Sequence, residues 1–181
     1  MVTIIFESHA TSLDNEAGLS SGCFDVELSE LGKAQAGELG ERYKDNSGLA
    51  AVFCSDLKRS YNTAEIAFRS SGISIIKDKR LRECDYGDLT RRPTEEVFGP
   101  HRGEYVTKPF PNGQSYEQTT QLIKGFLAEA LEKYNGNKIM IVGSRATQYG
   151  LENLINKVPL KEAVTAPWQW QPGWTYNLEK I

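Results

Sequence analysis

Residues 3–15 of the chain read Thr-Ile-Ile-Phe-Glu-Ser-His-Ala-Thr-Ser-Leu-Asp-Asn. The apolar, partly β-branched start of this segment is typical of a buried strand, and its small polar end is typical of a loop. His9 therefore lies where the predicted strand passes into the loop. A histidine at such a junction is either a hydrogen-bonded structural side chain or a catalytic group at the carboxyl end of a sheet strand, where open α/β folds place their sites.

Strand-like and helix-like patterns alternate along the rest of the chain. Further strands are predicted at 49–54, 73–76 and 138–143, with an edge strand at 174–178. Helices are predicted from Ser29 to about 46–48, and at 57–68, 116–134 and 146–156; Ser29, Ser55 or Asp56, and Ser115 are the expected caps of the first three. This alternation predicts an α/β three-layer sandwich, with a mainly parallel central sheet and helices on both faces. The apolar run at 138–143 favours a central strand.

Two stretches lack this regularity. Residues 14–25 are small and polar, which is typical of either a surface connection or a ligand-binding loop. Residues 89–113 predict an irregular excursion or lid with a short helix around Glu95, and we expect His101 to lie on its surface. Three tryptophans near the end are expected to pack in the core or in a lid: Trp168, Trp170 and Trp174. We expect a single domain over residues 1–181.

The composition narrows the classes of function. The net charge is -3 and no block of Lys or Arg occurs, so nothing favours binding to nucleic acid or to an anionic membrane. We expect no membrane span and no signal peptide. The three cysteines, Cys23, Cys54 and Cys84, form no metal-like pair, which favours free thiols and a cytoplasmic location. No metal or cofactor is expected, and a homodimer stays open as an assembly state.

Polar residues follow three of the predicted strands. They are Ser8-His9, Ser55-Asp56 with Arg59, and Ser144-Arg145. Because the carboxyl ends of parallel strands share one edge of a sheet, these groups are expected to converge, with Glu83 in a nearby loop. Arginine matches phosphate oxygens, histidine can accept a phosphoryl group, and a carboxylic acid can protonate a leaving oxygen. The set predicts a phosphate-ester site, although each arginine and Glu83 could instead be a solvated surface side chain.

In these residues the chain resembles the histidine phosphatase superfamily, which includes the cofactor-dependent phosphoglycerate mutases. The family opens with a strand, Arg-His-Gly-Glu-Thr and a later Asn, which residues 8–12 and Asn15 resemble. Three further motifs match in order. They are Gly22, Asp25, Leu28, Ser29, Gly32, Gln35 and Ala36; then Ser55, Asp56, Leu57, Arg59, Thr63 and Ala64; then Leu81, Glu83 and Gly87.

The resemblance implies a role for four residues. His9 would be the nucleophile that becomes a phosphohistidine, and Glu83 would be the general acid. Arg59 would bind the phosphate, and Asn15 would donate a hydrogen bond to the phosphoryl oxygens.

Two positions differ from the family pattern. Ser8 stands where the family usually has an arginine, and Ser144 stands where it usually has a second histidine. Arg145, next to Ser144, could supply the positive charge missing at Ser8, or it could be a surface arginine in a first helical turn.

Three functions follow as expectations. The first is hydrolysis of a small phosphomonoester. The second is binding of a phosphorylated ligand without turnover, because both Ser8 and Ser144 replace charged or catalytic side chains. The third is a mutase, which ranks lowest because it needs a more enclosed and more basic site.

Overall fold

The central sheet of the computed structural model, which describes residues 1–45 and 48–181, has five strands. In spatial order they are β4 (Ile75–Lys77), β3 (Leu49–Cys54), β6 (Lys138–Gly143), β1 (Val2–Ser8) and β7 (Trp174–Leu178). Neighbours from β4 to β1 run parallel, and β7 pairs antiparallel with β1. The mainly parallel sheet, its central strand at 138–143 and its edge strand at 174–178 are confirmed.

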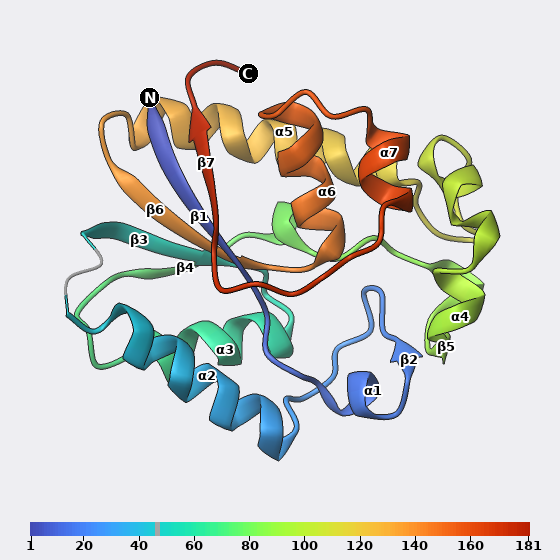
Figure 1. Ribbon diagram of the computed structural model, residues 1–181, viewed down its shortest axis with the longest axis horizontal. Helices are drawn as coiled ribbons and strands as arrows, with labels where there is room; N and C mark the ends of the chain where they lie inside the picture. Colours follow the sequence, from blue (N-terminus) through green and yellow to red (C-terminus); the bar gives the residue numbers. More distant parts are fainter. Residues whose placement is uncertain (46–47) are drawn as a thin grey trace.

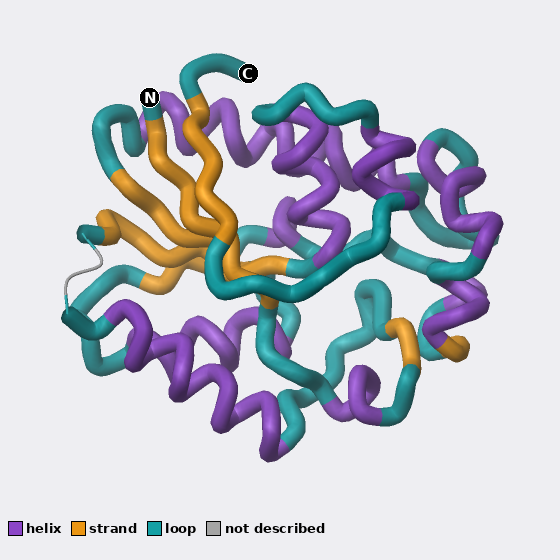
Figure 2. Tube along the Cα trace, in the orientation of Figure 1, coloured by secondary structure: helices purple, strands orange, loops and turns teal. Residues whose placement is uncertain are grey.

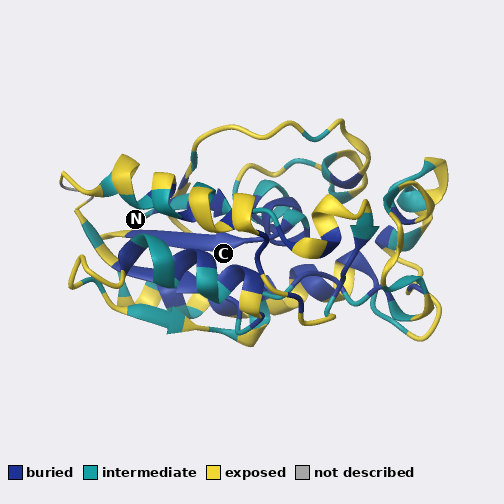
Figure 3. Ribbon diagram, turned by 90° about the horizontal axis from the view of Figure 1, so that it is seen from below, coloured by how far each residue is buried: buried dark blue, intermediate teal, exposed yellow. Residues whose placement is uncertain are grey.

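Helices cover both faces of the sheet, as predicted (Figure 1). One face carries α2 (Glu30–Tyr43) and α3 (Lys58–Phe68), and the other carries α5 (Tyr116–Lys133) and α6 (Arg145–Leu154). Successive residues of β6 alternate between these layers because side chains of a strand point to opposite faces. Met140 packs with Phe68 of α3, whereas Ile141 packs with Phe126 of α5. Figure 3 shows the buried strands between the two helical layers.

Two of the three predicted helix caps are confirmed. The Ser29 hydroxyl accepts from the Gly32 N–H, and the Ser115 hydroxyl accepts from the Gln118 N–H. The predicted cap of α3 is wrong, because Leu57 occupies that position and makes no side-chain hydrogen bond. Asp56 is instead bound in two contacts of 2.7 Å to the Arg82 guanidinium.

The polar segment 14–25 contains more structure than the sequence predicts. It includes most of α1 (Leu13–Glu16), which Ser12 caps together with Asn15, and the short strand β2 (Leu19–Ser20). The partner of β2 is β5 (Arg92–Pro93), which belongs to the predicted excursion. The excursion also contains α4 (Thr94–Val97), which confirms the short helix around residue 95, and the 3-10 helix η3 (Pro100–Val106). Another 3-10 helix, η2 (Gly87–Leu89), ends where the predicted excursion begins.

Several boundaries differ from the prediction. Strand β4 lies at Ile75–Lys77, not 73–76, and α2 ends at Tyr43; positions 46 and 47 of its predicted end lie outside the described residues. Leu31 of α2 and Leu122 of α5 are exposed apolar residues. The short helix α7 (Leu160–Thr165) was not predicted, because it is six residues long and Pro159 at its start offers no side-chain cap.

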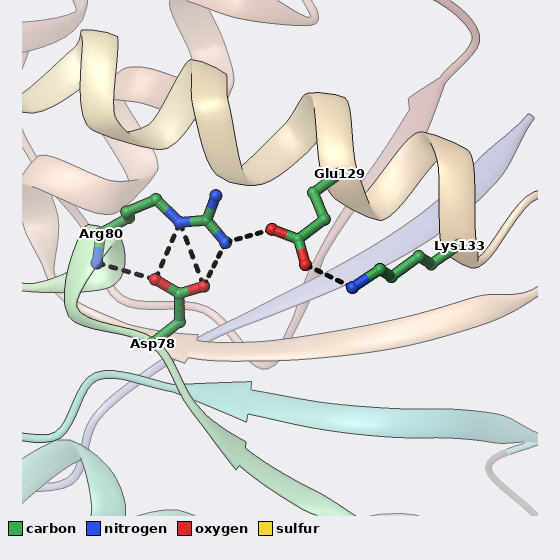
Figure 4. Close-up of polar contacts among 4 residues, drawn as sticks. All are labelled: Asp78, Arg80, Glu129 and Lys133. Atoms are coloured by element: carbon green, nitrogen blue, oxygen red, sulfur yellow. Dashed lines mark hydrogen bonds and ion pairs between the residues drawn. The ribbon is translucent and has the colours of Figure 1, made fainter.

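A chain of ion pairs lies beside the segment that precedes Glu83 in the sequence. Asp78, Arg80, Glu129 and Lys133 connect the 3-10 helix η1 (Lys79–Leu81) to α5 (Figure 4). Arg80 Nη2 and Lys133 Nζ each lie 2.7 Å from a carboxylate oxygen of Glu129. Such partly exposed pairs add about 0–1 kcal/mol each, so together they contribute modestly to holding η1 against α5.

The loop from α7 to β7 crosses the carboxyl end of the sheet (Figure 2). Trp168 and Trp170 belong to this loop, whereas Trp174 begins β7 and packs edge-on against Phe6 at 5.5 Å. Throughout residues 1–45 and 48–181, no helix is long and apolar enough to cross a membrane. The three cysteines are free.

Candidate active site

A cavity of about 660 Å³ lies where β1 ends, beside the start of α6. It is lined by residues from distant parts of the chain, including six of the seven predicted site residues. These six are Ser8, His9, Asn15, Arg59, Glu83 and Arg145. The convergence expected from a parallel sheet is therefore present at this edge.

His9 is held in one tautomer by two contacts. Its Nδ1 lies 2.8 Å from the Ala10 carbonyl oxygen, which can only accept, so Nδ1 carries the proton. Arg59 Nε–H lies 3.3 Å from His9 Nε2, which therefore presents its lone pair. Burial and the positive charge of Arg59 lower the pKa of His9 to about 3. At neutral pH the imidazole is therefore uncharged, and Nε2 can act as a nucleophile once its hydrogen bond from Arg59 is released to a bound phosphoryl group.

Arg59 is a buried side chain, with 3% of its surface exposed, and not the solvated arginine that its position alone would allow. Its Nη1 and Nη2 groups donate to the carbonyl oxygens of Phe24 and Gly22 at 2.9 and 2.6 Å. With the contact to His9, three of the five guanidinium N–H donors are engaged. The remaining donors stay available to an anion beside His9.

Glu83 is buried between the backbone of its own segment and the start of α6. Its Oε1 accepts from the Cys84 N–H at 2.7 Å, and its Oε2 accepts from the Ala146 N–H at 3.4 Å. Burial raises the pKa of this carboxyl, against the opposing effects of those N–H groups and of Arg59. The shift favours the protonated form, which a proton donor requires.

Arg145 lies in the cavity between two aromatic rings. Its guanidinium carbon is 4.8 Å from the centre of the Phe98 ring and 4.7 Å from that of Trp168. The Trp168 indole is fixed in turn, because its N–H donates to Gln148 Oε1 at 2.6 Å. The two rings hold the guanidinium by cation–π contact, and its N–H groups have no hydrogen-bond or ion-pair partner among the described residues. Arg145 is thus partly exposed in the first turn of α6, and it lines the cavity.

The other predicted site residues are placed differently. Asn15 Oδ1 accepts from the Ser12 N–H at 3.0 Å, which leaves the amide NH₂ of Asn15 to donate. The Ser8 hydroxyl donates to the His9 carbonyl oxygen at 3.3 Å and brings no charge to the cavity. Ser144 is 5% exposed, caps α6 and lies beside Thr147, with the two hydroxyls 3.3 Å apart. It does not line the cavity, which the sequence did not anticipate.

Further cavity residues were not predicted. Gln35, Glu38 and Arg42 line it from α2 at helical spacing, and Trp168 and Trp170 line it from the tail. The sequence predicted packing in the core or in a lid for these two tryptophans, and both border the cavity. The i, i+3, i+7 spacing on α2 gives a common face, but nothing local indicates that the face borders a cavity. His101 is exposed and paired with Glu104, as expected for a surface residue.

In the part of the chain that the structure describes, no three or more His, Cys, Asp or Glu side chains lie close enough together to hold a metal ion.

Together, these residues form a pocket suited to a phosphate ester. The chain matches the family model of the histidine phosphatase superfamily (branch 1) over residues 4–169, and it therefore belongs to that superfamily. This confirms the family predicted from the motifs.

Curated relatives carry mainly phosphatase or mutase names. The chain is 31% identical over 149 residues to "Phosphoserine phosphatase 1" of Hydrogenobacter thermophilus, covering 78% of this chain and 70% of the relative. It is 30% identical over 151 residues to "Uncharacterized phosphatase PhoE" of Bacillus subtilis, covering 83% and 76%. It is also 32% identical over 149 residues to "Probable phosphoglycerate mutase GpmB" of Klebsiella pneumoniae, covering 78% and 69%. Such relatives support phosphoester chemistry in general.

Solved structures share the fold. Bacillus stearothermophilus YhfR superposes with a TM-score of 0.82 at 23% identity, covering 95% of this chain and 88% of that chain. The mycobacterial glucosyl-3-phosphoglycerate phosphatase Rv2419c with VO3 gives 0.79 at 23% identity, covering 91% and 87%.

Proposed function

We propose that this chain hydrolyses small phosphomonoesters through a phosphohistidine formed on His9. The observation that carries the proposal is the tautomer and protonation state of His9. Its Nδ1 proton is held by the Ala10 carbonyl oxygen, and its Nε2 lone pair lies in the cavity beside Arg59. A pKa of about 3 keeps this nitrogen unprotonated at neutral pH.

In the first step, His9 Nε2 attacks the phosphorus of the substrate. The N–P bond forms as the bond from phosphorus to the leaving oxygen breaks. The Glu83 carboxyl, whose pKa is raised by burial, gives its proton to that oxygen, and the alcohol leaves.

In the second step, a water oxygen attacks the phosphorus of phosphohistidine. The Glu83 carboxylate takes a proton from the water, and the N–P bond breaks to return its electron pair to Nε2. The products are inorganic phosphate and the starting enzyme, with Glu83 protonated again.

Two arginines would balance the charge of the phosphoryl group. Arg59 is already bonded to His9, and Arg145 presents its unpaired N–H edge to the same cavity. We propose that Arg145 takes the part that an arginine at position 8 would have, with the Asn15 amide as an additional donor. Preorganised donors of this kind act strongly in a site from which water is excluded.

The test is release of phosphate from para-nitrophenyl phosphate. We expect turnover by the parent chain and its loss in His9→Ala, while the matched control His101→Ala keeps the parent rate because His101 is exposed and outside the cavity. Ser144→His adds the second histidine of the family pattern. If neither the parent chain nor a folded Ser144→His variant releases phosphate, catalysis is contradicted.

One observation favours a second candidate, binding of a phosphorylated ligand without turnover. Ser144 is buried as a helix cap, so no second histidine side chain reaches the cavity among the described residues. A phosphorylated ligand that raises the melting temperature of a chain without turnover would support this candidate. A mutase would instead move the phosphoryl group between substrate hydroxyls, which a coupled assay detects; we expect none.

A further inference from the structure

The cavity continues from His9 along α2 to the tail. We call this part the α2 arm and define it by Gln35, Glu38, Arg42 and Trp170, all of which line the cavity. None of these residues has a part in the proposed phosphoryl transfer. The full cavity of about 660 Å³ falls within the range of roughly 300–1,000 Å³ typical of small-molecule sites, so it can hold more than a phosphate group. The α2 arm therefore offers room beside His9 for the alcohol part of a substrate.

The charges of the α2 arm differ from those around His9. Arg42 is paired with Glu7, which is 1% exposed and 3.2 Å away, so the positive charge of Arg42 is compensated. Tyr43 also donates to Glu7, at 2.8 Å. Glu38 is exposed at the mouth of the cavity and has no hydrogen-bond or ion-pair partner among the described residues. Its carboxylate leaves the arm with an excess negative charge, whereas Arg59 and Arg145 make the His9 end positive.

Besides the Trp170 indole N–H and the Arg42 N–H groups that are not bonded to Glu7, the arm offers an amide donor and a carboxylate acceptor. Gln35 Oε1 accepts from both the N–H and the hydroxyl of Thr11, at 3.0 and 2.8 Å. Its amide NH₂ is therefore the group left to bind a ligand, and the Glu38 carboxylate can only accept. A ligand hydroxyl can accept from the Gln35 amide and donate to the Glu38 carboxylate. A carboxylate cannot donate and an ammonium group cannot accept, so neither can bind both groups.

Trp170 adds an apolar surface to the arm. Its side chain is 56% exposed, and its ring lies 5.9 Å from the Arg42 guanidinium carbon. A flat ring beside a polar donor and acceptor suits a ligand that has both C–H faces and hydroxyl edges.

We propose that the α2 arm recognises a neutral leaving group with several hydroxyls, so that the substrate is the monophosphate of a sugar or polyol without a second anionic group. This inference rests on the proposed function. The single phosphate lies with Arg59 and Arg145, and the hydroxyls lie with Gln35 and Glu38. A carboxylate or a second phosphate on the alcohol part is disfavoured because it meets the unpaired charge of Glu38.

The test compares two ligands that differ at one carbon, sorbitol 6-phosphate and 6-phosphogluconate. Binding is measured by calorimetry on the His9→Ala variant, in which no turnover can occur. We expect the dissociation constant of sorbitol 6-phosphate to be about fivefold lower, the size of one avoided like-charge contact near the surface. In His9→Ala with Glu38→Gln, the difference falls to about twofold or less. The control Glu41→Gln, which changes an exposed carboxylate on the same helix outside the cavity, keeps the full difference.

Several outcomes would overturn the inference. They are equal or tighter binding of 6-phosphogluconate, an unchanged difference in Glu38→Gln, an equal loss in Glu41→Gln, or no binding of either ligand. If His9→Ala does not fold, the ratio of kcat/KM for the two compounds on the parent chain gives the same decision. A parent chain that hydrolyses no phosphomonoester would contradict the proposed function, yet the binding comparison would still decide the preference of the arm.

Discussion

Replacing Arg145 by glutamine tests how the cavity acquires its second positive charge. The guanidinium is held by Phe98 at 4.8 Å and Trp168 at 4.7 Å, and its N–H edge bonds to no described residue. The substitution therefore breaks no hydrogen bond within the chain. It removes two stacking contacts of about 0.5–1 kcal/mol each, so we expect only a modest fall in the free energy of unfolding.

The larger effect is expected on catalysis. A hydrogen bond from a charged donor contributes about 1.5–3 kcal/mol, which corresponds to a fall in kcat/KM of roughly 10- to 150-fold. Arg145→Lys keeps the charge but loses the planar fork and the stacked faces, so its rate should lie between those of Arg145→Gln and the parent chain. Arg145→Gln should also bind anions more weakly than the parent chain, which weaker inhibition by inorganic phosphate would show.

The assay is steady-state hydrolysis of para-nitrophenyl phosphate, with the melting temperature as a check of the fold. Arg92→Gln is the control, because Arg92 is exposed, pairs with Glu96 and lies outside the cavity. If Arg145→Gln keeps kcat/KM within about threefold of the parent, Arg145 is not a phosphate ligand, and the stacked arginine is structural.

Three further predictions concern pH and packing. Glu83→Gln should lower kcat by roughly 10²–10⁴ on an alkyl phosphate and by less on para-nitrophenyl phosphate, whose leaving group needs no proton, and it should remove the alkaline limb of the pH–rate profile. The pKa of His9 is about 3 in the folded chain and about 6.5 in the unfolded chain, so between these pH values only the unfolded chain binds a proton at His9. The free energy of unfolding should therefore fall as the pH drops from about 6.5 toward 3, by about 1–2 kcal/mol at pH 5. Chemical denaturation at several pH values should show a smaller fall for His9→Asn. Gly32→Ala should destabilise the chain by about 1–3 kcal/mol, because the added Cβ would lie 1.9 Å from the Thr11 carbonyl oxygen. Gly37→Ala, on the same helix with open space around it, should instead stabilise the chain by about 0.5–1 kcal/mol. Equal changes of the melting temperature in the two variants would contradict the close contact between Gly32 and Thr11.

Local patterns predict the layers of this fold. The apolar run at 138–143 does form the central strand, and Ser29 and Ser115 do begin helices, because these signals depend on neighbouring residues. The predicted cap of α3 is wrong because it depends on a residue that is distant in the sequence. Asp56 is engaged by Arg82, which is distant in the sequence, and a tertiary contact of this kind overrides a local preference.

The candidate site also contains residues that the sequence predicts and residues whose surroundings it does not. His9, Arg59 and Glu83 follow strands or lie in a family motif, so the sequence places them together. The surroundings of Arg145 could not be predicted, because Phe98 comes from the excursion and Trp168 from the tail, and only folding joins them. Ser144 follows a central strand as predicted, yet its hydroxyl lies 3.3 Å from that of Thr147 and does not line the cavity.

The central claim is that His9 Nε2 accepts the phosphoryl group. The most direct measurement is rapid acid-free quenching of the chain during turnover of a phosphomonoester, followed by intact mass and peptide mapping under alkaline conditions, where phosphohistidine survives. The claim predicts one added PO₃ group on the peptide that contains His9, lost in acid and absent from His9→Ala. Turnover without any phosphorylated His9, or turnover retained in His9→Ala, would contradict it.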